Sequence, residues 1–128
     1  MQQPPVVYAV IAAWNAEGCI REALESLRSS LKAVRAVVVD NASTDATRSI
    51  IQTAFPETEL LSLPENAGFG SASNHGIRHA LARGADYILL MNQDAKVDPR
   101  TVELLSGILG AQRDVGIISP LHLSSDGT

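Results

Sequence analysis

The sequence predicts an α/β domain in which a mostly parallel sheet carries helices on both faces. Short apolar runs alternate with segments whose apolar residues recur at helical spacing, in the order βαβαβαβαβ. The first run, residues 6–12, is apolar throughout, as expected of a parallel strand that is buried on both faces. The length of 128 residues fits a single domain over residues 1–128.

The predicted elements follow one another at short intervals. Strands are expected over residues 6–12, 34–39, 58–63, 87–91 and 115–119. Helices are expected over residues 17–31, 46–54, 69–81 and 99–109. Pro56 ends the second helix because proline disfavours a helical residue before it, and Gly84 can end the third. Pro99 occupies the first helical position, where proline is tolerated, and Val102, Leu105, Ile108 and Leu109 are expected to face inward.

Composition and charge exclude several classes of protein. The net charge of −4 argues against a nucleic-acid-binding surface, which normally needs a basic face. No apolar run approaches the roughly 20 residues that cross a bilayer. Residues 1–5 lack the basic and apolar regions of a signal peptide. Cys19 is the only cysteine, so no intramolecular disulfide can form. A cytoplasmic location is the default expectation, and a peripheral position at the inner face of the membrane stays open.

The second predicted strand ends abruptly in polar residues. Val37, Val38 and Val39 run directly into Asp40. Ligands of open α/β sheets bind at the carboxyl edge of the strands, so Asp40 is a candidate binding residue. Ser43 or Thr44 is expected to cap a helix that starts near residue 45. The alternative is an ordinary strand–turn–helix junction, since Asp, Asn and Ser favour turns.

The first predicted strand leads into a second polar junction. A dinucleotide-binding domain would have Gly-x-Gly-x-x-Gly here, and that pattern is absent. The small Ala12 and Ala13, followed by Trp14 and Asn15, could flank a flat base or a ribose. Alternatively, Asn15 only caps the following helix and Trp14 only packs.

A third cluster spans residues 66–76. Asn66 precedes the third helix, Gly68 lets the chain turn close to a ligand, and Asn74 lies one or two turns into the helix. A glycine-containing loop with a capping Asn is the alternative. His75 has no second His or Cys at ligand spacing, so neither a metal ligand nor a general base is indicated.

The fourth predicted strand ends in Asn92, Gln93 and Asp94, at the same sheet edge as Asp40. This chain lacks a glycine-rich loop whose backbone N–H groups could bind a nucleotide diphosphate. The negative charge of such a ligand would therefore have to be neutralised in another way. A divalent cation held by Asp94 would do this, because carboxylate oxygens suit magnesium or manganese. A solvated turn is the alternative.

Together, these segments resemble a known family. VVVDNASTD, the Asn-x-Gly-x-Gly run with its later Asn, and YILLMNQDAKV are similar to family 2 inverting glycosyltransferases with the Rossmann-like GT-A fold. The similarity is greatest to the rhamnosyltransferase-like branch, and it extends from Val6 to about Pro120.

The resemblance implies transfer of a sugar from a UDP- or dTDP-sugar, with inversion, to a hydroxyl of a saccharide or lipid-linked acceptor. Asp40 would accept a hydrogen bond from the pyrimidine base, and Asp94 would bind Mg²⁺ or Mn²⁺ on the diphosphate. The implied nucleotide-binding residues are Ala12, Asn15, Asp40, Asn66, Gly68, Asn74 and Gln93. Asn92 replaces the first carboxylate of the family's Asp-x-Asp motif. An amide is a neutral, weaker metal ligand, so metal dependence stays open.

The family's general base lies in the second half of its proteins and is expected beyond Thr128. The chain is therefore expected to be the N-terminal, donor-binding half of a larger glycosyltransferase. Other classes fit less well. A receiver-like regulatory module would need paired acids after the first strand and a Lys near 115–119, and a sugar nucleotidyltransferase would need a basic Gly-rich loop. A non-catalytic nucleotide-binding or interaction domain stays open, and the sequence gives no oligomeric state.

Overall fold

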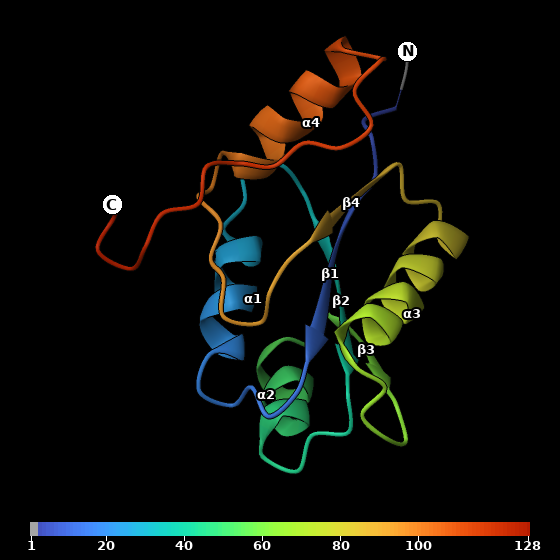
Figure 1. The fold of residues 1–128 in the computed structure, drawn as a ribbon, viewed down its shortest axis with the longest axis vertical. Helices are drawn as coiled ribbons and strands as arrows, with labels where there is room; N and C mark the ends of the chain where they lie inside the picture. The colour runs from blue at the N-terminus through green and yellow to red at the C-terminus, as the bar shows by residue number, and fades with distance from the viewer. Residues whose placement is uncertain (1–2) are drawn as a thin grey trace.

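The computed structural model describes residues 3–128, in which strands and helices alternate (Figure 1). Met1 and Gln2, part of the segment considered above for a signal peptide, lie outside the described residues. The strands are β1 (Val7–Ala13), β2 (Arg35–Asp40), β3 (Glu59–Ser62) and β4 (Tyr87–Leu90). The helices are α1 (Ile20–Arg28), α2 (Thr47–Ala54), α3 (Phe69–Ala82) and α4 (Thr101–Ala111).

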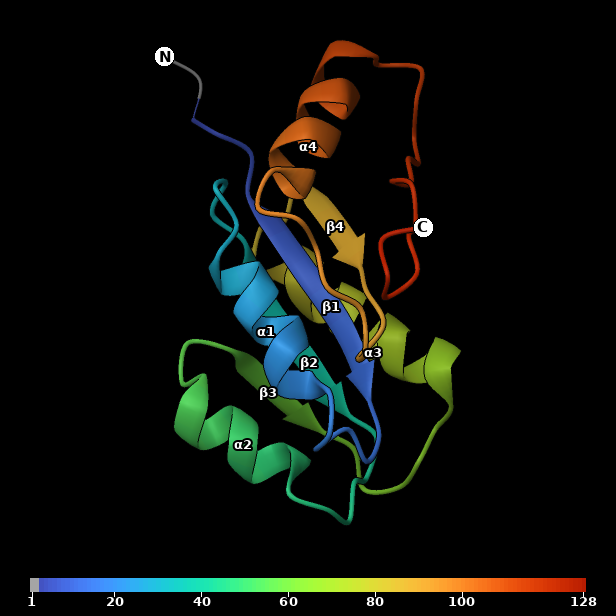
Figure 2. The same ribbon diagram turned by 90° about the vertical axis from the view of Figure 1, so that its left-hand side faces the viewer.

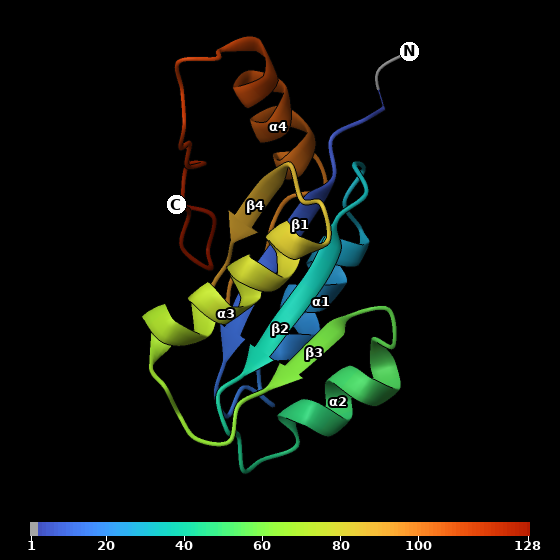
Figure 3. The ribbon, with the colours of Figure 1, turned by 90° about the vertical axis from the view of Figure 1, so that its right-hand side faces the viewer.

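The strands form one parallel sheet in the order β3-β2-β1-β4. Their arrowheads point to the same end of the molecule (Figure 3). In the register of the sheet, Ala13 lies opposite Asp40, and Asp40 lies opposite Ser62. The last residues of three strands therefore sit side by side, and the loops that follow them share one edge.

Helices cover both faces of the sheet. Figure 2 shows α1 and α2 on one face, and Figure 3 shows α3 on the other. Neighbouring residues of β1 enter different cores, since Ile11 packs with the residues of α1 and α2 while Val10 packs with those of α3. Both side chains are fully buried. The predicted α/β class with a parallel sheet covered on both faces is confirmed.

The predicted fifth strand is wrong. Residues 113–128 contain neither a helix nor a strand, and Ile117 is 92% exposed. Residues 116–118 lie against β4 and α4, where they line a small apolar cavity of about 140 Å³, without pairing to β4. A short apolar run indicates strand propensity, but it does not supply a hydrogen-bonded neighbour.

Several predicted helix boundaries shift. The first helix is shorter than predicted and begins at Ile20, because the backbone N–H groups of residues 15–17 bond to the loop after β2 and to the first residue of α2. Helix α2 begins at Thr47, and neither Ser43 nor Thr44 caps it. Helix α4 begins two residues after Pro99, and Ile108, which was predicted to face inward, is 40% exposed. Among the described residues, no helix has the length and apolar composition to cross a membrane.

Candidate functional site

A cavity of about 300 Å³ opens at the carboxyl edge of the sheet. It is lined by Ala12, Ala13, Trp14, Asn41, Asn66, Phe69, Asn92, Gln93 and Asp94. These residues come from the ends of β1, β2 and β4 and from the start of α3. The structure thus brings four of the predicted site residues, Ala12, Asn66, Gln93 and Asp94, around one cavity. The predicted residues Asn15, Asp40, Gly68 and Asn74 are not among those that line it.

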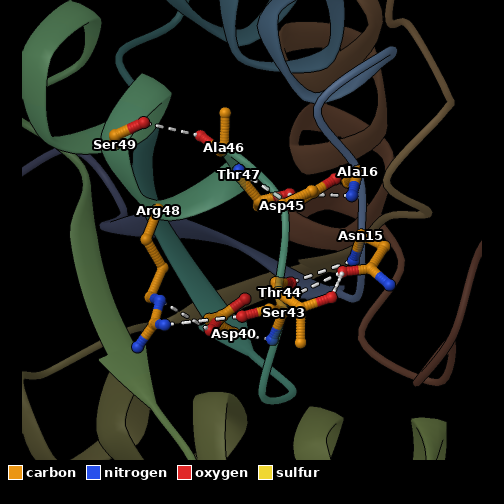
Figure 4. A network of polar contacts seen from close by, with 10 residues as sticks. All are labelled: Asn15, Ala16, Asp40, Ser43, Thr44, Asp45, Ala46, Thr47, Arg48 and Ser49. Atoms are coloured by element: carbon orange, nitrogen blue, oxygen red, sulfur yellow. Dashed lines mark hydrogen bonds and ion pairs between the residues drawn. The ribbon is translucent and has the colours of Figure 1, made fainter.

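Asp40 does not line the cavity, but its sheet partner Ala13 and its chain neighbour Asn41 both do. Its side chain is completely buried. Asp40 Oδ2 accepts a hydrogen bond from Ser43 N–H (3.3 Å) and pairs with Arg48 Nε (3.5 Å), as Figure 4 shows. Asp40 Oδ1 is buried and has no hydrogen-bond partner. A buried carboxylate oxygen without a partner is costly and rare, so this oxygen needs a hydrogen-bond donor other than the described protein groups.

Asn15 joins the loops that follow β1 and β2 (Figure 4). Its Oδ1 accepts a hydrogen bond from Thr44 N–H (2.9 Å), and its own N–H donates to Ser43 Oγ (2.9 Å). It has a φ of +45°, which asparagine adopts more readily than most residues. The amide oxygen of Asn15 is therefore occupied within the protein.

Asp45 precedes the N-cap residue Ala46 of α2 and bonds both to the first residue of that helix and to the loop after β1. Asp45 Oδ1 accepts hydrogen bonds from Thr47 Oγ1 and from Thr47 N–H, and Oδ2 accepts one from Glu17 N–H. Partial desolvation by itself raises the pKa of Asp45, but these hydrogen bonds together outweigh it, so the pKa lies below its ordinary value of 3.8. The ionised form of Asp45 is therefore favoured in the folded protein.

We expect Asp45→Asn to lower the melting temperature at pH 7 and to have a progressively smaller effect in acid. A carboxylate with a lowered pKa stabilises the fold above its unfolded-state pKa, and this stabilisation is lost as the pH falls through the folded-state pKa. The difference between wild type and variant should therefore shrink below pH 3.8. Thermal unfolding followed by circular dichroism between pH 2.5 and pH 7 measures it. A difference that stays constant over that range would contradict the assignment.

The start of α3 contributes Asn66 and Phe69 to the cavity wall. Asn66 Oδ1 accepts a hydrogen bond from Gly68 N–H (2.9 Å). Among residues 3–128, no acceptor pairs with Asn66 Nδ2, which leaves this donor for a ligand. Gly68 precedes the helix with a φ of +84°, a conformation that favours glycine. Asn74 is exposed on α3.

Two residues of the cavity wall were missed by the sequence prediction. Asn41 follows Asp40 directly, and its polar character was visible, but nothing in the sequence separated it from a turn residue. Phe69 is the first residue of the third predicted helix, and nothing in the sequence set it apart from the other apolar residues there. In the structure Phe69 is 54% exposed and lines the cavity, as does Trp14, which is 51% exposed. Two exposed aromatic side chains at one cavity suit the flat or apolar faces of a ligand.

The loop after β4 supplies oxygen atoms to the cavity. Gln93 Oε1 accepts a hydrogen bond from Trp14 N–H (2.9 Å), which ties this loop to the end of β1. The side chains of Asn92 and Asp94 are exposed in the cavity wall. No group of three or more His, Cys, Asp or Glu side chains that could hold a metal occurs among the described residues. The oxygens present fit a hard cation that takes most of its ligands from a bound phosphate, and they do not form an all-protein metal cage.

Sequence comparison identifies the family. The profile described as "Glycosyl transferase family 2" matches residues 8–127. The chain belongs to this family. It is 30% identical over 122 residues to the dTDP-rhamnosyl transferase RfbF of Shigella flexneri, a match covering 94% of this chain and 40% of RfbF. The chain thus spans less than half the length of this relative.

Solved glycosyltransferases share the fold. TarS of S. aureus, in complex with UDP-GlcNAc, superimposes with a TM-score of 0.76 at 22% identity over 84% of this chain and 32% of TarS. The mannosyltransferase PcManGT of Pyrobaculum calidifontis, in complex with GDP-Man and Mn²⁺, gives a TM-score of 0.72 at 25% identity over 84% and 33% of the two chains. The GT-A-like fold and the family predicted from the sequence motifs are confirmed.

Proposed function

We propose that this family 2 chain is the donor-binding part of an inverting glycosyltransferase that uses a UDP- or dTDP-sugar. The observation that carries the proposal is the cavity at the sheet edge, two of whose lining residues, Ala13 and Asn41, are the sheet partner and chain neighbour of Asp40, which has a buried, unpaired Oδ1. Uracil and thymine each present an imide N–H, which can donate a hydrogen bond to such a carboxylate oxygen. RfbF is named a dTDP-rhamnosyl transferase, and TarS was solved with UDP-GlcNAc, which supports this donor class.

The other predicted residues are proposed to surround the base and the ribose. Ala12 and Asn66 line the cavity, and the free Nδ2 of Asn66 can donate to a base or ribose oxygen. Gly68 and Asn74 belong to the same loop and helix as Asn66. Asn15 and Gln93 accept hydrogen bonds from Thr44 N–H and Trp14 N–H, so their contribution is to hold the loops in place.

The diphosphate is proposed to lie near Asp94, with Mg²⁺ or Mn²⁺ between them. When bound, the metal would stabilise the negative charge that grows on the departing diphosphate. PcManGT was solved with Mn²⁺, which supports a metal in this fold. The amide of Asn92 is a weaker ligand than a carboxylate, so Asp94 would be the charged ligand that residues 3–128 supply.

The general base and the acceptor site are proposed to lie outside this chain, which covers 40% of RfbF and 32% of TarS. In this arrangement residues 1–128 form one nucleotide-sugar-binding unit, and the acceptor is a saccharide or a lipid-linked saccharide. A cytoplasmic location, including a peripheral one at the membrane, belongs to the same proposal, because the free Cys19 suits a reducing compartment.

Calorimetric titration of the chain with UDP, dTDP, GDP and CDP, with and without Mn²⁺, tests the proposal. UDP or dTDP should bind more tightly than CDP, because cytosine lacks the imide N–H. The absence of binding by every nucleotide at millimolar concentration would favour a non-catalytic interaction domain.

Replacing Asp94 by asparagine is expected to remove any enhancement of UDP affinity by Mn²⁺ while leaving metal-free binding almost unchanged. The variant keeps the shape of the side chain and loses its charge, and the remaining protein oxygens are neutral amides. Asp98→Asn is the matched control, because Asp98 bonds to Arg100 N–H outside the cavity. Equal Mn²⁺ enhancement in wild type and Asp94→Asn would remove Asp94 from the metal site.

A further inference from the structure

The loop before α3 and the first turn of that helix have almost no packing to hold them in place. Residues 64–71 are all exposed, yet Asn66 and Phe69 from this segment form part of the cavity wall. Segments with few buried contacts open locally at low free-energy cost unless hydrogen bonds hold them. The position of this wall therefore depends on polar contacts.

The side chain of Asn41 makes two such contacts. Ala67 N–H donates to Asn41 Oδ1 (2.8 Å), and Asn41 Nδ2 donates to Gly68 O (3.2 Å). Both bonds span more than 25 residues of chain, and they hold the two residues that lie between Asn66 and Phe69. A primary amide is the side chain that can accept from one backbone group and donate to the next.

Asn41 itself is rigidly placed. It is 4% exposed, it follows the last residue of β2, and its backbone N–H donates to Ala13 O (2.8 Å). The amide therefore transmits the fixed position of the sheet edge to the exposed segment that carries Asn66 and Phe69.

We propose that Asn41 is a positioning residue for the nucleotide, which fixes Asn66 and Phe69 in the conformation that binds it. This inference rests on the proposed function. Binding to a cavity wall that is already ordered costs less conformational entropy than binding to a mobile one. The two hydrogen bonds of Asn41 should therefore increase the affinity for the nucleotide.

The experiment compares wild type, Asn41→Ala and Asn41→Asp. In the free protein, amide exchange of Ala67 should be fastest in Asn41→Ala, which loses both bonds, and slower in Asn41→Asp, which keeps the acceptor for Ala67 N–H. Affinity for UDP with Mn²⁺ should fall about tenfold in Asn41→Ala, in line with the loss of two neutral hydrogen bonds. UDP binding should restore more protection at residues 64–71 in the variant than in wild type. Titration with uridine, which has no phosphate, separates loop positioning in Asn41→Asp from charge repulsion.

Asp86→Ala is the matched control. Asp86 Oδ2 accepts a hydrogen bond from Val6 N–H (2.7 Å), so it also joins distant backbone, but at the amino end of the sheet. This variant should lose stability without losing UDP affinity. If Asn41→Ala does not fold, the order of uridine affinities in wild type and Asn41→Asp decides the question.

The possible failures are distinct. If wild type binds UDP and both Asn41 variants bind as tightly, the inference is overturned and the proposed function stands. If wild type binds neither UDP nor dTDP, the proposed function fails and the inference fails with it, even where the exchange of Ala67 is faster.

Discussion

Replacing Asp40 by asparagine is expected to weaken UDP binding about 10- to 150-fold, which corresponds to the loss of a hydrogen bond to a charged group. The carboxylate is fully buried and has one oxygen without a partner. Because this oxygen is already desolvated and fixed in direction, a ligand N–H can bond to it without displacing water from the carboxylate. Asparagine fills the same volume, but its neutral amide is a weaker acceptor and can present an NH₂ group instead. Isothermal titration calorimetry at constant ionic strength measures the difference.

Asp45→Asn provides the control for the charge. Asp40 ends β2 and Asp45 lies in the loop that follows, so both substitutions remove one negative charge from the same end of the sheet. A lower negative charge by itself favours an anionic ligand. A loss of affinity in Asp40→Asn alone would therefore come from the lost acceptor. Arg48 is half exposed and can be solvated when its partner is neutral, so the variant should remain folded. Unchanged UDP affinity in a folded Asp40→Asn protein would remove Asp40 from the site.

The architecture was predictable because parallel strands buried on both faces leave a strong local signal. Val37, Val38 and Val39 have no polar face, and all three are fully buried. The failed strand at 115–119 has a similar local pattern. What it lacks is a hydrogen-bonded neighbour, and this property belongs to the whole sheet. The predicted cap of α2 by Ser43 or Thr44 was wrong for a related reason. Ser43, Thr44 and Asp45 are all good capping residues, and only the approach of the loop after β1 determines which role each takes.

The sequence predicted the location of the candidate site better than the contacts that its residues make. Polar residues after parallel strands must share the carboxyl edge, and the structure brings Asn66 and Asp94 to one cavity there. The sequence could not tell which amides are used inside the protein. Asn15 and Gln93 accept backbone hydrogen bonds, while the neighbouring Asn41, which was not selected, holds a cavity wall. These roles depend on distances between loops.

Replacing Gly76 by alanine is expected to destabilise the protein by about 1–3 kcal/mol, the usual cost of inserting a methyl group into a packed core. Gly76 lies in α3 where the helix crosses β1 and β2. A Cβ atom here would lie 2.5 Å from Val10 Cγ1 and 3.0 Å from Val39 Cγ2. Both valines are fully buried and β-branched, so neither can rotate away without moving the sheet. The helix must therefore shift outward or the two strands must yield.

The helix propensity of alanine works in the opposite direction, by about 1 kcal/mol relative to glycine. Gly107→Ala in α4 isolates this term, because no atom lies within 4 Å of a Cβ at that position. Chemical denaturation should show Gly107→Ala equal to or more stable than wild type and Gly76→Ala less stable. Phe69, the first residue of α3, lines the cavity. An outward shift of the helix should therefore lower UDP affinity in Gly76→Ala as well. Equal stability of the two variants would mean that α3 does not pack as closely on Val10 and Val39 as the structure shows.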